Sequence, residues 1–421
     1  MKTLVVLGLG PVGLTLAVSA GLHHPGSRII GLDKNQNLVN LLNTCKGYLK
    51  TKDKDFHLLL NAAILEKKIQ ITSNMEWLSE TDVVVLALGP IVVNEQIDYE
   101  SFLMALDEIV NRARPDTLLI IASTLPIGTM QGILPKLSKL RVAYAFERIT
   151  PGENMLSSAG EGIKIIAAKD TKSYEATRDF FQFDESIFIS FEEAEMTKLL
   201  ENSYRASNIA LIHEWTLLAE STGVNLFSII DSIRLRVGTH DNIRAPGPGI
   251  GGPCLLKDSM ISILNNHMVD MPFLKLAMKT SEAMNNHIVD LVGEVDLLGV
   301  LGLSYRSDVS DIRNSPSVNV ISKVLATKTY VYDPLVSEVE DYPQINLITS
   351  FEDFIDRVNV LLVFHFLTDE MMSLLISKKR KMKIIDTCNM ISDVLAEELH
   401  LGGAKLVGVG KGHWRSRGYD Q

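Results

Sequence analysis

The sequence predicts an α/β protein with two doubly wound, Rossmann-like domains joined by a central helical region with a long spine helix. Near both ends of the chain, short apolar, β-branched runs alternate with helical stretches, which is the pattern of a parallel sheet covered by helices. From Phe191 the pattern changes to long helices. A chain of 421 residues is too long for one core. We therefore expect three domains, at 1–190, 191–295 and 296–421.

Composition describes an ordinary globular protein and argues against several functions. Hydrophobic residues make up 46% and charged residues 22% of the chain, and no apolar run approaches the roughly 18 residues that span a membrane. The formal net charge of −10 argues against nucleic acid or an anionic membrane surface as partner. Cys45, Cys254 and Cys388 lie far apart and form neither a disulfide framework nor a metal motif. We expect a cytoplasmic protein without a metal site.

The first αβ unit carries a dinucleotide-binding pattern. A strand at 3–7 leads into a glycine turn, a helix at 14–22, a second strand at 28–32 and an acidic residue, Asp33. Glycines let a pyrophosphate approach the backbone at a helix N-terminus. An acid at this position accepts a hydrogen bond from the ribose 2′-hydroxyl and repels a 2′-phosphate, which favours NAD over NADP. The predicted NAD contacts are Gly8, Gly10, Pro11, Val12, Gly13 and Asp33.

Three further strands, at 82–88, 118–122 and 142–146, end in loops with polar or small residues. Because ligands bind at the carboxyl ends of parallel strands, these loops are predicted to face cofactor and substrate. Thr124 and Glu147 also have structural explanations, as a turn-capping hydroxyl and a solvated acid at a strand end. The residues predicted to face cofactor are Gly89, Pro90, Ser123 and Thr124, and those predicted to face substrate are Glu147 and Arg148.

The central helices present a polar stripe. Lys198, Asn202 and Arg205 stand at i, i+4 and i+7 and so share one helical face. Such a stripe is either the solvated side of an amphipathic helix or a set of donors for a developing oxyanion. A second helical stretch is predicted from Lys257 to Leu298, interrupted at Pro272. We expect it to serve as a spine between domains and as a dimer surface.

Between these helices, a loop rich in glycine and proline precedes a cysteine, Cys254. Glycine permits close approach of the backbone, which suggests a loop moulded around a ligand. If a helix starts near the thiol, Asp258 lies on the same face and the helix N-terminus favours the nucleophilic thiolate. The alternative is a buried structural cysteine beside a glycine turn.

The last part of the chain repeats the α/β pattern without the glycine motif. Strands are predicted near 300, at 329–333, at 359–365 and at 383–389. The expected ligand is therefore a nucleotide that differs from a dinucleotide. Arg306 and Arg313 are predicted to contact phosphate or base, with solvated loop arginines as the alternative. His365 is interpreted as a strand-end histidine and Cys388 as a packing residue.

Together these motifs resemble the UDP-glucose/GDP-mannose dehydrogenase family over essentially the whole chain. The matching stretches are Gly8–Gly13, Ser123–Thr129, Phe146–Arg148, Lys198 with Asn202, Gly251–Asp258, Arg306–Pro316 and Tyr332–Pro334. The most specific is the glycine-rich loop with Cys254 and Asp258. The resemblance implies a four-electron oxidation of the C6 alcohol of a nucleotide sugar to a carboxylate, with two NAD.

The resemblance also implies roles for individual residues. Cys254 resembles the nucleophile that captures the C6 aldehyde as a thiohemiacetal, which then becomes a thioester. Lys198 and Asn202 match the pair that steadies the C6 oxygen, and Asp258 matches a carboxylate that works with them in proton transfer. Thr124 and Glu147 match the positions that place and activate water. The remaining expected substrate contacts are Arg148, Arg205, Gly249, Gly251, Gly252, Tyr305 and Arg306, while Arg313 is expected at the cofactor.

Arg236 is similar to an arginine that, in some members, reaches the sugar of the neighbouring subunit. This implies a homodimer, although the spacing from Arg236 to Cys254 is slightly longer here. Gly89-Pro90 stands where Gly-Thr-Pro is usual, which removes one hydroxyl on the NAD side. Arg306 occupies a position that is commonly lysine.

The motifs that bear on the substrate are mixed. Phe146–Arg148 with Pro151 and Gly152 resembles the branch that oxidises UDP-N-acetylhexosamines, whereas Leu255–Asp258 resembles the UDP-glucose branch. We expect a UDP-N-acetylhexosamine, with UDP-glucose as the alternative. A 3-hydroxyacid or 6-phosphogluconate-type dehydrogenase would leave Cys254 and the last domain unexplained. A non-catalytic protein that binds NAD or a nucleotide sugar is opposed by the joint presence of Lys198, Asn202, Cys254 and Asp258.

Overall fold

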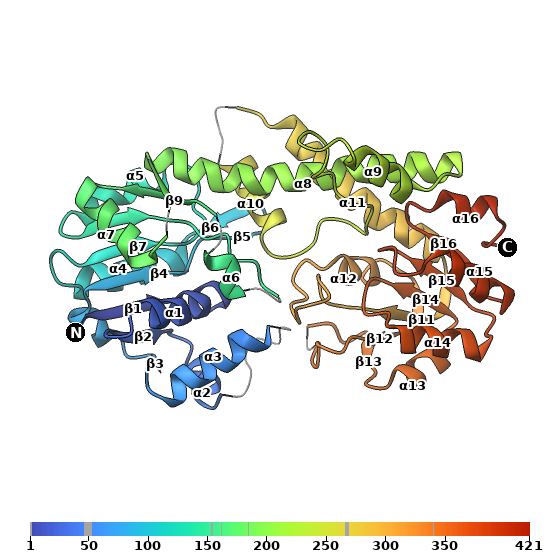
Figure 1. Ribbon diagram of the computed structural model, residues 1–421, viewed down its shortest axis with the longest axis horizontal. Coiled ribbons are helices and arrows are strands. Elements are labelled where there is room, and N and C mark those ends of the chain that lie inside the picture. The colour runs from blue at the N-terminus through green and yellow to red at the C-terminus, as the bar shows by residue number, and fades with distance from the viewer. Residues whose placement is uncertain are drawn as a thin grey trace. The chain divides into compact units, whose positions relative to one another are not determined.

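The computed structural model describes residues 2–45, 53–152, 155–160, 162–183, 185–265, 269–339 and 341–421. The chain divides into two compact units, and each is described by itself (Figure 1). Unit 1 comprises Met1–Glu201 and Met260–Val269, and unit 2 comprises Asn202–Ser259 and Asp270–Gln421. Among the described residues, no helix is both long and apolar enough to cross a bilayer.

Unit 1 is built on an eight-stranded sheet with the order β10-β9-β8-β7-β4-β1-β2-β3. Six neighbouring strands of this sheet are parallel and follow the 3-2-1-4-5-6 order of a Rossmann fold. In that order they are β3, β2, β1, β4, β7 and β8. β9 pairs antiparallel with β8. The strands are β1 (Thr3–Leu7), β2 (Arg28–Leu32), β3 (Ile69–Thr72), β4 (Val83–Leu86), β7 (Leu118–Ile121), β8 (Arg141–Tyr144), β9 (Lys164–Ala168) and β10 (Ser186–Ile189), with a separate hairpin of β5 (Ile91–Val93) and β6 (Gln96–Asp98).

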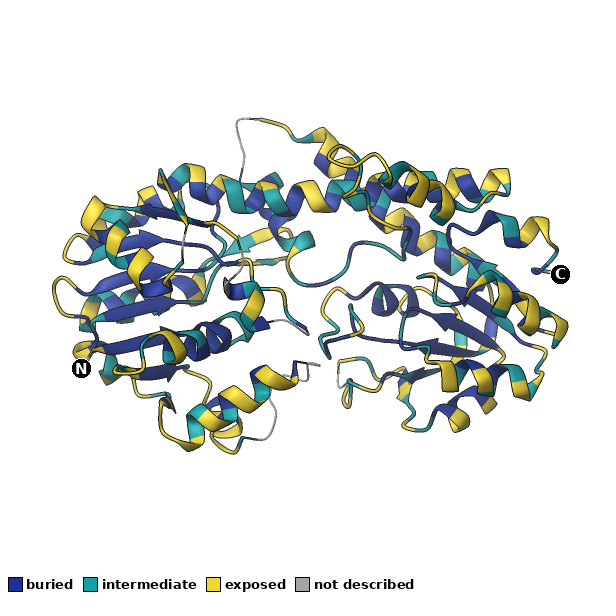
Figure 2. Cartoon of the chain, in the orientation of Figure 1, coloured by how far each residue is buried: buried dark blue, intermediate teal, exposed yellow. Residues whose placement is uncertain are grey.

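Both faces of this sheet are covered, which explains why its strands are apolar without interruption. In β1, Leu4 and Val6 enter one hydrophobic core, and Val5 and Leu7 enter the other. The buried strands appear dark blue in Figure 2. The helices of unit 1 are α1 (Pro11–His23), α2 (Gln36–Asn43), α3 (Lys54–Leu65), η1 (Met75–Glu80), α4 (Glu100–Arg112), α5 (Thr129–Ile133), η2 (Leu134–Leu137), α6 (Met155–Gly160) and α7 (Thr171–Phe181).

Unit 2 contains a six-stranded, all-parallel sheet with the order β13-β12-β11-β14-β15-β16, which is again the Rossmann order. The strands are β11 (Val295–Leu301), β12 (Ala326–Tyr332), β13 (Ile345–Leu347), β14 (Val360–Val363), β15 (Lys383–Asp386) and β16 (Lys405–Gly408). The helices are α9 (Leu226–Arg234), α11 (Pro272–Val292), α12 (Pro316–Ile321), α13 (Phe351–Asp356), α14 (Asp369–Lys378), α15 (Asp393–Leu401) and α16 (Gly412–Ser416).

Two helices, α8 and α10, belong partly to unit 1 and partly to unit 2. α8 spans Phe191–Thr222 and, at 32 residues, is the longest helix in the part of the chain that the structure describes. α10 spans Leu255–Leu264. The helical stretch predicted from Lys257 to Leu298, with an interruption at Pro272, corresponds to α10 and to α11, which starts at Pro272. Its predicted end at Leu298 is wrong, because α11 ends at Val292 and β11 follows. Gly293, at φ +72°, ends α11, since only glycine adopts this conformation without strain.

The two sheets share the same joint between their first strand and the following loop. In unit 1 the amide of Leu9 donates to Asp33 Oδ2 at 2.8 Å, and in unit 2 the amide of Leu303 donates to Asp333 Oδ2 at 2.8 Å. Each leucine follows a glycine in the left-handed region, with φ values of +96° and +93°. The α/β pattern that occurs near both ends of the sequence therefore corresponds to the same hydrogen-bonded backbone arrangement in both sheets.

Candidate active site

The glycine turn after β1 uses its three glycines differently. A Cβ on Gly13 would overlap the carbonyl oxygen of Gly8, and a Cβ on Gly8 would lie 2.6 Å from Leu88 Cγ. A Cβ on Gly10 would meet nothing within 4 Å. Gly10 is the N-cap of α1, which starts at Pro11. Open space at a helix N-terminus is the environment that a pyrophosphate requires, so this turn fits NAD.

Asp33 is held rigidly at the end of β2. Its Oδ2 accepts from the amide of Leu9 at 2.8 Å, and its Oδ1 accepts from the amide of Asn35 at 2.9 Å. The residue is half-buried. Because a carboxylate oxygen has two lone pairs, these two bonds leave capacity for a ribose hydroxyl. The carboxylate is thus oriented by the backbone before any ligand arrives.

The loops after β4 and β7 meet in unit 1. A Cβ on Gly89 would lie 2.8 Å from Ser123 Cβ and 3.1 Å from the carbonyl oxygen of Thr124. Pro90 is buried, whereas Ser123 and Thr124 are half-buried. Four of the predicted ligand-facing residues therefore come together, and Gly89 is required by this close approach.

Glu195, which was not identified from the sequence, connects α8 to the loop that follows Thr124. Its carboxylate accepts from the amides of Gly128 and Met130 at 2.6 and 2.7 Å. Burial raises the pKa of Glu195 to about 7, although the two amide donors act in the opposite direction.

This buried carboxyl predicts a pH dependence of stability. The folded state holds the Glu195 proton more tightly than the unfolded state, where the pKa is near the ordinary 4.5. The stability contributed by the protonated form is therefore full below about pH 4.5 and is lost as the pH rises through about 7, on the order of 3 kcal/mol. Urea unfolding at a series of pH values measures the slope. Glu195→Gln is expected to remove this part of it, and an unchanged slope in that variant contradicts the assignment.

Glu147 is buried rather than solvated at the end of β8, so the interpretation as a solvated acid is wrong. Its carboxylate forms an ion pair with Lys164, the first residue of β9. Lys198 Nζ donates to the main-chain oxygen of Glu147 at 2.9 Å. Burial raises the pKa of Glu147, and the ammonium groups of Lys164 and then Lys198 oppose this rise. Unit 1 thus places a carboxylate and two ammonium groups together.

Lys164 was not identified from the sequence. Its only signal there is a lysine at the start of an otherwise apolar strand. Arg148, by contrast, was predicted to contact substrate, and in unit 1 its guanidinium pairs with Glu201 and donates to the main-chain oxygen of Ile163 at 2.9 Å. The Arg148 guanidinium carbon also lies 5.1 Å from the centroid of the Phe146 ring.

In unit 2, Cys254 is exposed and stands immediately before the first residue of α10. The alternative of a buried structural cysteine is therefore wrong. Asp258 follows one turn later, donates its amide to the carbonyl oxygen of Cys254 at 2.9 Å, and is buried. Asn202 Nδ2 donates to Asp258 Oδ2 at 2.5 Å, and Lys257 Nζ lies 3.3 Å from Asp258 Oδ1. A helix does start next to the thiol, so Asp258 lies one turn after Cys254, as expected for that case.

The glycines before Cys254 bring the loop against the chain's own side chains. A Cβ on Gly251 would lie 2.8 Å from Pro316 Cδ, and a Cβ on Gly252 would lie 2.9 Å from the Tyr305 ring. A Cβ on Gly249 would lie 2.9 Å from a side-chain amide of α11. The amide of Gly252, whose φ is +85°, donates to the main-chain oxygen of Asn314 at 3.2 Å. These glycines position the thiol through packing within unit 2.

Tyr305, which packs against this loop, is followed in the chain by the two predicted arginines, Arg306 and Arg313. Burial raises the pKa of Tyr305 to about 12, with smaller contributions from Asp311 and from Cys254. Arg313 Nη2 lies 2.6 Å from Asp311 Oδ2, and this hydrogen bond is the main cause that raises the pKa of Arg313. Arg306 Nη2 donates to Asp308 Oδ2 at 2.7 Å. Both arginines are therefore paired with carboxylates rather than simply solvated.

Two further predicted substrate residues are exposed. Arg205 is exposed on α8, three residues beyond Asn202. Arg236 is exposed just after α9. His365 behaves as interpreted, because its Nε2 lies 3.2 Å from Ser304 Oγ at the joint of the second sheet.

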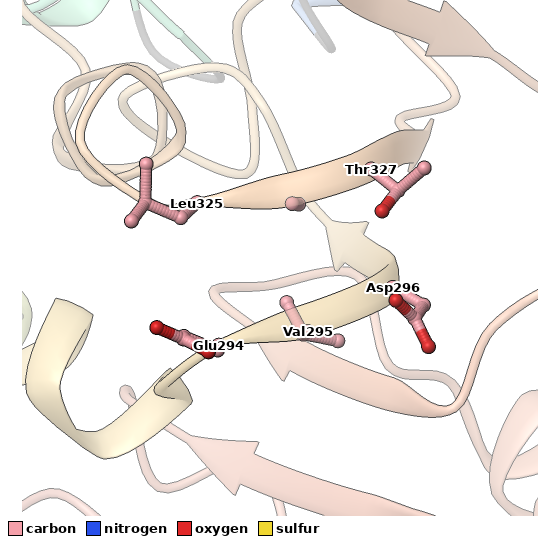
Figure 3. A pocket seen from close by; sticks show the side chains of 6 residues that line it. Glu294, Val295, Asp296, Leu325 and Thr327 are labelled. Carbon is pink, nitrogen blue, oxygen red and sulfur yellow. The ribbon is translucent and has the colours of Figure 1, made fainter.

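A shallow pocket in unit 2 lies at the amino ends of β11 and β12 (Figure 3). The residues that line it are Glu294, Val295, Asp296, Leu325, Ala326 and Thr327. Its two carboxylates disfavour a phosphate group, and it is at the opposite end of β12 from Asp333. The pocket is thus no part of the predicted nucleotide site. Among the described residues, no cluster of three side chains of the metal-binding types was found.

A dinucleotide turn at the carboxyl edge of a Rossmann sheet is typical of an NAD-dependent oxidoreductase. The exposed thiol at a helix start is its candidate nucleophile. Three domain profiles of one family match this chain. They are the UDP-glucose/GDP-mannose dehydrogenase family NAD binding domain at 2–183, its central domain at 192–286 and its UDP binding domain at 299–393.

Individual proteins are also similar to this chain over nearly its whole length. The UDP-N-acetyl-D-mannosamine dehydrogenase of Methanococcus vannielii is 30% identical over 444 residues, which cover 98% of each chain. That of Methanocaldococcus jannaschii is 26% identical over 434 residues, covering 98% of this chain and 97% of its own. The structure of the UDP-D-ManNAc dehydrogenase from Pyrococcus horikoshii has the same fold, with a TM-score of 0.84 at 24% identity, over 98% of this chain and 100% of that chain.

The chain belongs to the UDP-glucose/GDP-mannose dehydrogenase family. It is an NAD-dependent nucleotide-sugar dehydrogenase, and the resemblance stated from its motifs is confirmed.

Proposed function

We propose that this protein oxidises the C6 hydroxyl of a UDP-N-acetylhexosamine to the carboxylate, through a covalent intermediate on Cys254. One observation carries the proposal. An exposed thiol stands at the start of α10, and the buried Asp258 one turn later is bound by Asn202. The names of the relatives described above, which are UDP-N-acetyl-D-mannosamine dehydrogenases, support the choice of sugar.

The thiol has a clear chemical purpose. NAD, when bound, supplies the oxidant for each of the two two-electron steps. After the first step the Cys254 thiolate adds to the C6 aldehyde and forms a thiohemiacetal, so that the aldehyde cannot escape. After the second step the carbon is held as a thioester, which water hydrolyses. The helix N-terminus at Leu255 favours the thiolate form that this addition requires.

The remaining residues handle charge and protons. We assign Lys198 and Asn202 to the C6 oxygen, because an ammonium and an amide stabilise negative charge as it develops there. Asp258, which accepts from Asn202 at 2.5 Å, exchanges protons with this pair. Thr124 and Glu147 are assigned to the hydrolytic water. Arg148, Arg205, Arg236, Tyr305 and Arg306 remain proposed substrate contacts, and Arg313 a proposed cofactor contact.

The test is the yield of NADH per mole of sugar across a panel of UDP- and GDP-sugars. Two NADH with a UDP-N-acetylhexosamine is the expected result. Two NADH with UDP-glucose as the best substrate would move the protein to that branch. One NADH per sugar would contradict the thioester route, and no turnover of any sugar would contradict the proposed function altogether.

Asp33 predicts the cofactor preference. Because its carboxylate is fixed where the adenosine ribose is expected, it repels a 2′-phosphate. We expect NAD to be preferred over NADP in kcat/KM by roughly 100-fold or more, and Asp33→Asn to reduce this preference by about tenfold. Asp333→Asn, at the same joint of the second sheet, is the matched control and leaves the preference unchanged. Equal turnover with both cofactors in the unaltered protein contradicts the role.

A homodimer is part of the proposal. Five of the exposed apolar residues of α8, a helix with yellow segments along its length in Figure 2, are regularly spaced. They are Met196, Leu200, Tyr204, Leu211 and Leu218, with exposed fractions of 44%, 47%, 59%, 43% and 62%. Their spacing of four and seven residues puts them on one face of the helix. Such a face suits a second copy of the same helix. Light scattering measures the mass, and a monomer at all concentrations contradicts it.

A further inference from the structure

Unit 1 contains a buried ion pair in an aromatic environment. The side chains of Lys164 and Glu147 are only 6% and 4% exposed. Lys164 Nζ lies 4.1 Å from the centroid of the Phe181 ring and 5.4 Å from that of Phe183. Aromatic faces attract a desolvated ammonium, so these rings compensate part of its lost hydration. Burial lowers the pKa of Lys164, and the Glu147 carboxylate directly beside it opposes this shift.

A buried ion pair of this kind contributes little to the net stability of a folded protein. Removing two charges from water costs roughly as much as their attraction returns, and apolar replacements of similar volume are often neutral or stabilising. Glu147 is at the same time the residue whose main-chain oxygen accepts from Lys198. A buried carboxylate beside two lysines at the end of a parallel strand is instead typical of a functional site.

We propose that Lys164 is a positioning residue, which holds the Glu147 carboxylate ionised and oriented so that it accepts the proton of the hydrolytic water. This inference rests on the proposed function, because it needs a thioester to hydrolyse. Without the Lys164 ammonium, which is the cation paired directly with its carboxylate, a carboxyl group this deeply buried takes up a proton more readily and is less available as a base.

The step balances as follows. Water adds to the thioester carbon, forming the new C–O bond, while one of its protons passes to Glu147. The C–S bond breaks and its electron pair stays on sulfur, which regenerates the Cys254 thiolate. The proton on Glu147 and the second proton of the water, which remains on the new carboxylic acid, both pass to solvent, and the sugar leaves as the carboxylate. No redox change occurs in this step, and Lys164 keeps its own proton throughout.

Lys164→Met tests the inference. Both oxidations are expected to proceed, so each site releases two NADH in a first burst and then turns over at least about tenfold more slowly at pH 7. The acid limb of the steady-state rate is expected to move to higher pH by about one unit or more, because the unpaired Glu147 is harder to ionise. Mass spectrometry of the intact protein is expected to find the sugar on Cys254. Lys164→Arg keeps the charge and is expected to restore much of the rate.

A second buried pair provides the matched control. Lys411 Nζ lies 3.0 Å from Asp386 Oδ2 in unit 2, with side chains 2% and 0% exposed, and 4.1 Å from the Trp414 ring centroid. Lys411→Met is expected to lower the melting temperature and to leave the acid limb in place. If Lys164→Met shows the same behaviour, or keeps the unaltered rate and pH profile, the inference is overturned.

A measurement on the unaltered protein covers the case in which Lys164→Met does not fold. The infrared carboxyl band of Glu147 is identified by its loss in Glu147→Gln, and at pH 7 it is expected at the position of an ionised carboxylate. A protonated Glu147 overturns the inference. The kinetic measurements separate the two proposals: absence of turnover on any UDP-sugar defeats the proposed function, whereas turnover without the burst in Lys164→Met defeats only the role of Lys164.

Discussion

Cys254→Ala is expected to abolish formation of the uronic acid, with a loss of at least about 10³-fold in the steady-state rate. Without the sulfur no thiohemiacetal forms, and the aldehyde from the first oxidation has nothing to hold it for the second. The product mixture, analysed by mass spectrometry alongside NADH yield, is expected to contain at most one NADH equivalent per sugar and no acid.

Cys388→Ala is the control for the loss of a thiol. Burial raises the pKa of Cys388 to about 12, so that this sulfur stays protonated at neutral pH and is a poor nucleophile. We expect Cys388→Ala to keep nearly the full rate. Acid formation by Cys254→Ala at the unaltered rate would remove Cys254 as the nucleophile, and with it the proposed route.

Gly13→Ala is expected to lower the free energy of unfolding by about 3 kcal/mol or more and to prevent NAD binding. Its methyl group would overlap the carbonyl oxygen of Gly8, and a backbone atom cannot move aside as a flexible side chain does. Relief requires α1 to shift away from the turn. Thermal unfolding with and without NAD measures both effects, because a ligand that binds the folded state raises the melting temperature.

Gly10→Ala is the partner experiment. Gly10 has a φ of −68° and open space where the methyl group would lie, so the change is expected to alter stability by less than about 1 kcal/mol. The methyl group would occupy the space assigned to the pyrophosphate and reduce NAD affinity by about tenfold or more. Unchanged NAD binding in Gly10→Ala would show that the cofactor does not approach this turn.

Local signals were sufficient for the first sheet and for the thiol. β1 and β2 match the predicted strands residue for residue, because both faces of the sheet are covered and the strands are continuously apolar. α1 starts at Pro11, three residues before the prediction, because proline suits the first turn of a helix. The pairing of Cys254 with Asp258 follows from helical spacing alone once a helix starts at Leu255.

Contacts between residues far apart in the chain could not be predicted from the sequence. Lys164 begins β9 and Glu147 follows the end of β8, the antiparallel neighbour of β9, and nothing in the sequence around either residue indicates the other. Glu195 reaches a loop more than sixty residues earlier in the chain, at a separation of 67 residues from Gly128. The helix predicted up to Leu298 failed for a different reason: Val295–Leu298 is apolar enough for either structure, and only the glycine at 293 marks the boundary.

The exposure of Cys254 has a consequence for how such a protein survives oxidative conditions. Of the three cysteines it is the exposed one, and peroxide attacks the thiolate form of accessible sulfur. A sulfenic acid at Cys254 would halt the proposed catalysis while leaving the folded chain intact. Thiols can reverse that first stage, but further oxidation to the sulfinic acid would inactivate the molecule permanently. The chemistry that traps an aldehyde thus also makes this sulfur the protein's most vulnerable atom to oxidants.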